Sequence, residues 1–208
     1  MIFNKRMNVH SIVKGCRMPK SDKREEIVRA ALELIAENGF HGAPMAMIAD
    51  RAGVGAGTIY RYFENKDVLI NELYRDLEER IYPAILAGYE PATPIRKRFL
   101  HLGSALLRYF ILNPLDFRYL EQFHNSPYGV AYRRDKILGK KEGCNVFREL
   151  FEEGGAERIL KDLPLVVLFA LSFGPLLAVA RDHILGFIRL EDVLITQTVE
   201  ACWDAIKK

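Results

Sequence analysis

Residues 44–63 constrain the fold of this chain more than any other stretch, because they indicate two short helices joined by a tight turn. Pro44 suits a first helical turn, where its missing N–H would be unpaired in any case. Gly53 tolerates the positive φ of the turn, and Ala49 is small enough for two backbones to cross closely. The apolar residues that would lock the second helix onto the first are Ile48, Val54 and Ile59. The spacing predicts a helix-turn-helix, although any small helical hairpin has the same pattern.

Helical periodicity extends along the rest of the chain, and almost no stretch alternates with a period of two. Asp22 and Glu25 are spaced like a capping box, Gly39 suits a helix end, and Asn65 precedes a long helix over about 66–88. Later helices are expected near 94–112, 115–125, 129–153, 163–187 and 191–206, with breaks at Asn113-Pro114, Ser126-Pro127, Gly154-Gly155 and Gly186. The predicted fold class is all-α, with a three-helix N-terminal unit and a helical C-terminal unit.

Positive charge is concentrated in the first third of the chain. Residues 1–66 hold 11 Lys and Arg against 7 Asp and Glu, a net charge of +4, whereas residues 67–208 hold 19 against 20, a net charge of −1, and the sum is +3. A polyanion would therefore be met at the N-terminal end. An excess of four charges is small, and a solvated basic face explains it about as well.

The second helix of the hairpin carries groups that suit a nucleic acid. Small residues at its start allow close approach to a DNA backbone, and its exposed N–H groups favour phosphate. Hydroxyls and a guanidinium then follow over the width of one groove, and a lysine begins the next helix. The candidate DNA-binding residues are Gly57, Thr58, Tyr60, Arg61, Tyr62 and Lys66. The alternative for Tyr60 and Tyr62 is packing in the core.

Several segments between Ile27 and Tyr74 together carry a family resemblance. They are Ala30-Ala31, Leu34-Ile35, Gly39-Phe40, Ile48-Ala49-Asp50-Arg51-Ala52-Gly53-Val54, Gly55-Ala56-Gly57-Thr58-Ile59-Tyr60-Arg61-Tyr62-Phe63 and Asn65-Lys66-Asp67-Val68-Leu69. This stretch, about a quarter of the chain, resembles the DNA-binding domain of TetR-family regulators. The resemblance implies a homodimer that binds a pseudo-palindromic operator, usually as a repressor, with Thr58, Tyr60, Tyr62 and Lys66 at DNA-contacting positions. Family members often begin the second helix with Thr or Ser, and this chain has Ala43-Pro44 instead.

The resemblance also suggests how the chain is divided. We expect a flexible basic arm over 1–20, a TetR-type helix-turn-helix domain over 21–81 with its motif at 44–63, and a helical ligand-binding and dimerisation domain over 82–208. Residues 163–180 contain no charge, and a matching stripe on the last helix consists of Val193, Ile195, Val199, Cys202 and Ile206. So large an apolar surface usually marks an interface. The last two helices are predicted to form the dimer, with a monomer core or a membrane contact as alternatives.

Aromatic residues in the C-terminal part suit a mostly apolar pocket for a small effector. The candidate ligand-binding residues are Phe110, Phe117, Tyr119, Phe123, Tyr128, Phe151 and Phe173. Glu121, Gln122 and His124 are candidates for polar specificity, although a histidine beside a helix break is more often at the surface. Ordinary helix-helix core is the alternative for the aromatic set.

Catalytic and metal-binding patterns are missing from the sequence. It contains no HExxH motif, nucleophile elbow or phosphate loop, and its three cysteines and five histidines are scattered. We therefore expect a cytoplasmic protein that is not an enzyme and has no cofactor or metal. Its expected partners are double-stranded DNA, a small-molecule effector and a second copy of the chain. The alternative is a non-specific DNA-binding or membrane-associated helical protein that uses the basic arm and residues 163–180.

Overall fold

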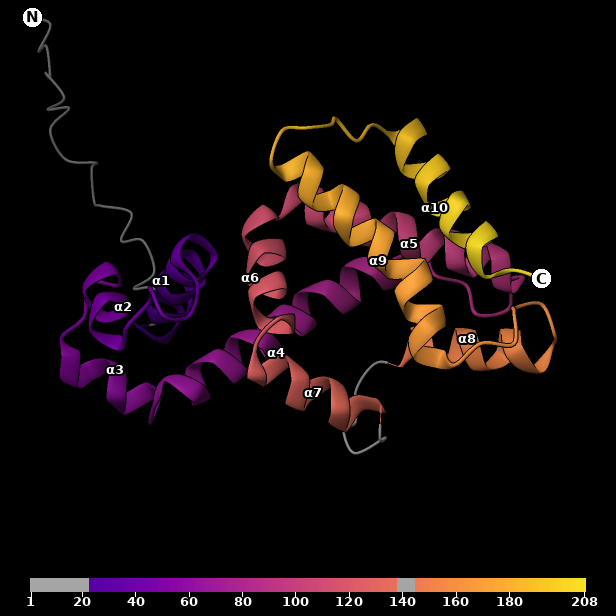
Figure 1. Cartoon of the computed structure of the whole chain (residues 1–208). Coiled ribbons are helices and arrows are strands. Elements are labelled where there is room, and N and C mark those ends of the chain that lie inside the picture. Colours follow the sequence, from indigo (N-terminus) through magenta and orange to yellow (C-terminus); the bar gives the residue numbers. More distant parts are fainter. Residues whose placement is uncertain (1–22, 138–144) are drawn as a thin grey trace, which may run out of the picture.

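The computed structural model describes residues 23–137 and 145–208, which form ten α-helices (Figure 1). They are α1 (Lys23–Asn38), α2 (Met45–Arg51), α3 (Ala56–Tyr62), α4 (Lys66–Leu86), α5 (Ile95–Leu112), α6 (Pro114–His124), α7 (Pro127–Ile137), α8 (Val146–Ala156), α9 (Leu165–Ile184) and α10 (Asp192–Ile206). Within the described ranges the β-type pairing is a single isolated bridge between Leu160 and Lys207. The predicted all-α fold is confirmed. The expected basic arm, 1–20, and the Asp22 cap lie outside the described residues.

The first three helices form a compact head, drawn in indigo in Figure 1. The apolar stripe of α1 is buried, with Ile27, Ala31 and Ile35 all fully shielded from solvent. Gly39 follows α1 with φ at 69°, a backbone conformation that glycine adopts without steric cost. Both α2 and α3 lie beyond this turn, and α2 packs against both α1 and α3. The head is therefore built largely from contacts between neighbouring parts of the sequence.

Helix α4 carries the chain out of the head and into the larger C-terminal body, α5–α10 (Figure 1). Its first turn is capped by Asn65, whose side-chain oxygen accepts a hydrogen bond from the Val68 N–H at 2.9 Å, as the sequence predicts. Leu69, Leu73 and Leu77 form a buried stripe along it. Because α4 belongs to both parts, it joins their cores into one continuous cluster.

Helix α5 is the centre of the body and packs against α4, α8, α9 and α10. Gly103 permits the close approach of α10, because a Cβ placed there would lie 2.7 Å from Cγ1 of Val199. Phe99 on the same helix is 1% exposed and lies beside the rings of Phe151, Phe173 and Trp203. The body core is thus a layer of aromatic rings around α5.

Two expectations about the body are wrong. A single helix over 129–153 is replaced by α7 and α8, and Asn145 before α8 is not helical. The expected break at Gly154-Gly155 lies inside α8, which ends at Ala156. The reason is packing: a Cβ at Gly154 would lie 2.7 Å from Cδ1 of Leu160, so this glycine admits a neighbouring side chain and does not end the helix.

Candidate nucleic-acid interface

The turn between α2 and α3 has the geometry that a helix-turn-helix requires. Gly53 adopts φ 65°, and the Val54 N–H donates to the Ala49 carbonyl at 2.9 Å. Ala49 is 2% exposed and Ile59 is fully buried. The inward face of α3 is thus held against the head by Ile59, and its opposite face is left to solvent.

The outward face of α3 exposes polar and aromatic side chains together. Tyr60 is 55% exposed and Tyr62 is 40% exposed, while Arg61 is exposed and Thr58 is half-buried. Tyrosine gives large contact area with a polar tip, so it suits a wet interface. The alternative that these two tyrosines belong to the core is wrong. A Cβ at Gly57 would meet nothing within 4 Å, so packing inside the chain does not require glycine there.

Lys66 has a structural contact that sequence reasoning missed. Its ammonium donates a hydrogen bond to the carbonyl oxygen of Phe40, in the turn after α1. Partial burial lowers the pKa of Lys66, and neighbouring Asp67 opposes that shift. Lys66 and Phe40 are 26 positions apart, and no local sequence signal pairs them. Lys66 therefore holds the α1–α2 connection against the start of α4. The other N–H groups of its ammonium can donate hydrogen bonds to a phosphate.

Two arginines of the head form ion pairs with side chains of α1 and α4. Arg51 lies 3.5 Å from both Glu33 and Glu37 of α1, and Arg24 lies 2.7 Å from Glu72 with its guanidinium 5.6 Å from the centre of the Phe63 ring. These contacts hold α2 and α4 to α1.

The start of α2 departs from the family pattern in the way the sequence suggests. Pro44 occupies the N-cap position, and no side chain accepts a hydrogen bond from the first turn. Ala43 before it is fully buried. The hydroxyl that often caps this helix in the family therefore has no substitute here.

The head contacts the body through α6 and α7. The Phe40 ring meets Tyr119 and Tyr128 edge-on, with centroids 6.2 and 5.6 Å away. The Tyr128 hydroxyl donates to Oδ1 of Asp67 at 2.5 Å, and the Tyr119 hydroxyl donates to the Ile70 carbonyl at 2.5 Å. We call these contacts the joint. They attach α6 and α7 to the first turns of α4, which begins at Lys66.

The seven aromatic ligand candidates do not form one lining. Tyr119 and Tyr128 belong to the joint, and Phe123 stacks on Tyr74 at 3.9 Å. Phe110 and Phe117 form a separate buried pair at 5.1 Å, and Phe151 and Phe173 lie 6.0 Å apart in the body core. Phe151 lines a cavity of about 390 Å³ beside the α8–α9 connection. Their role in binding a ligand stays a prediction.

The three polar candidates near these rings lie on α6. Glu121 forms an ion pair with Arg181 of α9. The Gln122 side chain approaches Gly39, where a Cβ would lie 3.3 Å from its Oε1. His124 is exposed, with Nε2 3.2 Å from the Tyr74 hydroxyl. In this structure α6 thus turns its polar groups toward neighbouring helices.

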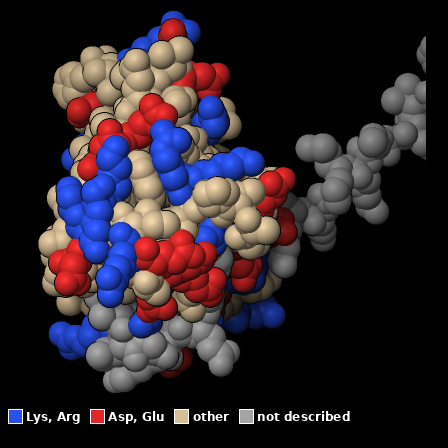
Figure 2. Space-filling view, turned by 90° about the vertical axis from the view of Figure 1, so that its right-hand side faces the viewer, with Lys and Arg blue, Asp and Glu red and all other residues tan. Residues whose placement is uncertain are grey.

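The stripe predicted on the last helix belongs mostly to the core of this chain, because Ile195, Val199, Cys202 and Ile206 are 0–4% exposed. Other aliphatic side chains of α9 and α10 are exposed. Val166, Val167 and Leu171 of α9 are 37–39% exposed, and Val193 of α10 is 70% exposed. Among the described residues α9 alone is long and apolar enough, by length and composition, to cross a membrane, and 28% of that window is buried. On the side that bears α8, α10 and the C-terminus, Figure 2 shows Lys and Arg interspersed with Asp and Glu. That side therefore lacks the single-sign field that attracts a polyanion.

Comparison with known proteins gives matches over both parts of the chain. A family model described as bacterial regulatory proteins, tetR family, matches residues 27–73, and one described as tetracyclin repressor-like, C-terminal domain, matches residues 94–207. An HTH-type transcriptional regulator of Haemophilus influenzae is 25% identical over 194 residues, which cover 92% of this chain and 100% of that protein.

Solved structures agree with these matches. A putative TetR-family transcriptional regulator from Vibrio parahaemolyticus is 35% identical, with a TM-score of 0.71, over 90% of this chain and 99% of that one. FadR from Bacillus subtilis, solved in complex with stearoyl-CoA, has a TM-score of 0.70 at 20% identity, over 88% of this chain and 99% of that one. At that identity the likeness concerns the fold alone.

Proposed function

The chain belongs to the TetR family of transcriptional regulators, and from this premise we propose that it is a ligand-responsive repressor. In this proposal a dimer binds a pseudo-palindromic operator and is released by a small, mostly apolar effector. The observation that carries it is the outward face of α3, where Tyr60, Arg61 and Tyr62 are exposed while Ile59 anchors the helix. A helix that is anchored on one side and exposes hydroxyls and a guanidinium on the other suits a major groove.

The proposed DNA contacts divide into two kinds. Thr58, Tyr60 and Tyr62 face the bases and the groove walls, and Gly57 allows the start of α3 to come close. Arg61 and Lys66 neutralise phosphates, which supplies affinity without sequence information. We assign these contacts to a DNA-binding domain over 21–81, and the effector and dimer functions to residues 82–208.

The proposed dimer uses α9 and α10. Two observations support this role: the exposed valines and leucines of these helices, and the absence of charge from residues 163–180. A dry two-fold interface requires the same apolar patch on both copies. Two heads would then lie roughly one turn of DNA apart, about 34–36 Å. An effector that binds more tightly to a dimer with a different spacing between its heads would shift the population toward that dimer, which does not fit the operator.

Relatives support a small effector and a non-enzymatic role. FadR from Bacillus subtilis was solved in complex with stearoyl-CoA, so a ligand with a long apolar part is compatible with this fold. Relatives are described as transcriptional regulators, and we propose a cytoplasmic regulator without catalytic activity.

Selection from a pool of random DNA duplexes tests the repressor proposal. The full chain should enrich one pseudo-palindrome whose half-sites are centred one helical turn apart. It should bind that sequence roughly 10³-fold or more tighter than random DNA at physiological salt. Equal affinity for all duplexes would contradict the proposal and would favour the non-specific alternative.

A further inference from the structure

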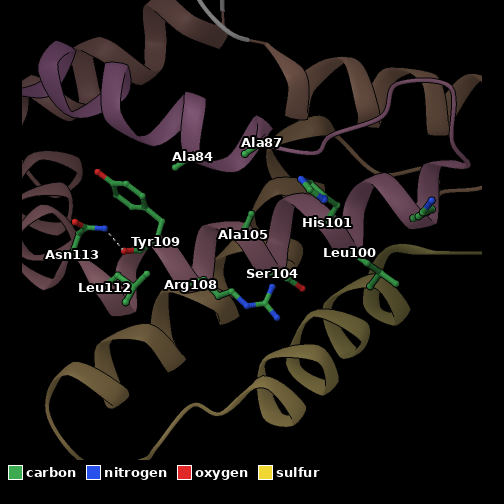
Figure 3. A pocket seen from close by; sticks show the side chains of 11 residues that line it. Ala84, Ala87, Leu100, His101, Ser104, Ala105, Arg108, Tyr109, Leu112 and Asn113 are labelled. Carbon is green, nitrogen blue, oxygen red and sulfur yellow. Dashed lines mark hydrogen bonds between the residues drawn. The ribbon is translucent and has the colours of Figure 1, made fainter.

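A groove on the outside of the body has no role in the function proposed above. It runs between the last turns of α4 and the outward face of α5 and has a volume of about 780 Å³ (Figure 3). Ala84 of α4 and Ala87, the C-cap residue of that helix, line one side, while Ser104 and Ala105 face them from α5. Because all four side chains are small, the space between the two helices stays open. None of the seven aromatic ligand candidates lines this groove.

The formally charged side chains that line the groove are both cations, Lys97 and Arg108, and no carboxylate lines it. His101 lines the groove between them. At 100° per residue these three positions lie within roughly 40° of one another on α5, and they span about 16 Å along its axis. They therefore form a basic stripe along one wall.

The stripe is available to an incoming anion. Lys97 lies 3.7 Å from Glu90 and Arg108 lies 2.9 Å from Asp192, and in each pair both side chains are about half exposed or more. Such surface pairs contribute little free energy, so a ligand carboxylate competes with them easily. His101 points toward α4 in Figure 3 and its Nε2 lies 3.1 Å from the Ile85 carbonyl oxygen, which orients the ring.

The far end of the groove offers an exposed aliphatic side chain, Leu112, beside the amide of Asn113. Leu112 is 77% exposed, so an alkyl chain can cover it. It lies at the end of α5 beyond Arg108, and Ala105 separates it from His101 along the groove. Leu112 also lines a neighbouring groove between α1 and α4, so this end lies where the head meets the body.

We propose that the α4–α5 groove is a binding site for a free carboxylate with an alkyl tail. The carboxylate binds the stripe formed by Lys97, His101 and Arg108, and the tail covers Ala105 and Leu112. Charge complementarity selects the anion, and burial of the tail over small side chains supplies the rest of the affinity. This proposal concerns a second ligand site and does not depend on operator binding.

Calorimetric titration of the full chain with decanoate, below its micelle concentration, tests the proposal. Decanol and decyltrimethylammonium are probes with the same tail and a neutral or positive head. We expect decanoate to bind, decanol to bind at least tenfold more weakly, and the ammonium compound not to bind. Equal binding of all three, or no binding of decanoate, would overturn the proposal.

Variants then locate the site. The double substitution Lys97→Gln and Arg108→Gln should weaken decanoate binding at least tenfold, and Ala105→Leu should weaken it by filling the groove. Arg189→Gln, at an 86% exposed arginine between α9 and α10, is the matched control and should bind as the parent does. If the double variant keeps the parent affinity, decanoate binds elsewhere and the groove assignment is wrong. Circular dichroism establishes that each variant is folded. Lys97 and Arg108 are exposed, so we expect their substitution to leave the fold intact.

Discussion

The head and the body expose large side chains of different kinds. On α3 of the head these are Tyr60 and Tyr62, which have polar tips, whereas on α9 and α10 they are aliphatic, with Leu171 and Val193 as examples. A tyrosine surface keeps its hydroxyls in contact with water and polar groups, and an aliphatic surface gains free energy only when another apolar surface covers it. The difference supports the proposal that the head contacts DNA, a hydrated partner, and that the aliphatic surface of the body forms the dimer.

Substituting a charge on the aliphatic surface is the largest expected effect. Leu171→Glu would place a carboxylate of each copy in the proposed two-fold interface without a cation, at a cost of roughly 3–5 kcal/mol. We expect sedimentation velocity to show monomers of the variant at micromolar concentration, where we expect the parent to be a dimer. Val130→Glu, on the exposed surface of α7, is the matched control and should stay dimeric. A dimeric Leu171→Glu variant would show that the aliphatic surface has another purpose.

Removing an aromatic group from the head should affect affinity alone. Tyr60→Ala should weaken specific operator binding by about 1–3 kcal/mol, which is about five- to 150-fold. Because Tyr60 is 55% exposed, the free energy of unfolding should change by less than about 0.5 kcal/mol. Fluorescence anisotropy and urea unfolding measure the two quantities. A loss of stability as large as the loss of affinity would mean that Tyr60 supports the fold of the head.

Lys66→Ala should act on both quantities. We expect weaker binding to every duplex and a salt dependence whose slope falls by roughly 0.9, because one phosphate contact is lost. We also expect unfolding to become easier by about 0.5–1.5 kcal/mol, because the hydrogen bond to the Phe40 carbonyl is lost. Arg61→Ala is the control, since Arg61 is exposed. It should weaken binding and reduce the salt slope without changing the free energy of unfolding. A Lys66→Ala variant with reduced stability and an unchanged slope would leave Lys66 with a structural role alone.

The joint gives the smallest expected effect. Tyr128→Phe keeps the ring against Phe40 and removes the hydroxyl that donates to Asp67, so unfolding should become easier by about 0.5–1.5 kcal/mol. That hydrogen bond raises the pKa of Tyr128 from 10.0 to about 12, with burial as a second cause. Because the folded state favours the neutral phenol, this contribution is fully present below pH 10 and is lost as the pH rises toward 12.

Urea unfolding at pH 8 and at pH 11.5 checks the prediction for the joint. The stability difference between the parent and Tyr128→Phe should be largest at pH 8 and should shrink at pH 11.5. Tyr62→Phe lies outside the joint and should show no such difference at pH 8. A Tyr128→Phe effect that is the same at both pH values would exclude the hydroxyl–carboxylate bond as its cause.

Local signals in the sequence predict the head well. The interval from Ala49 to Gly53 defines the turn, and the structure has Gly53 at φ 65° with Val54 bonded to Ala49. Asn65 caps α4 as predicted. Each of these features depends on residues at most five positions apart, so a linear pattern contains the necessary information.

Contacts between distant residues are where sequence reasoning fails. Tyr128 and Asp67 are 61 positions apart and Lys66 and Phe40 are 26 apart, and no periodicity connects them. Composition suggested that seven aromatic residues share a pocket. The structure places two of them in the joint, stacks Phe123 on Tyr74, and leaves two in a separate pair and two in the body core. Their role in binding a ligand stays a prediction. Gly154 looks like a helix break in the sequence, and Leu160 packs against it in the fold.

The sequence by itself determined that this chain is helical and that residues 44–63 form a helix-turn-helix, because capping, glycine turns and apolar periodicity are properties of neighbouring residues. Only the tertiary structure decided which aromatic rings are exposed, where Lys66 donates its hydrogen bond, and that small side chains on α4 and α5 leave a groove beside a basic stripe. These depend on how helices far apart in the sequence pack, and packing is decided by the shapes and volumes of all the side chains together.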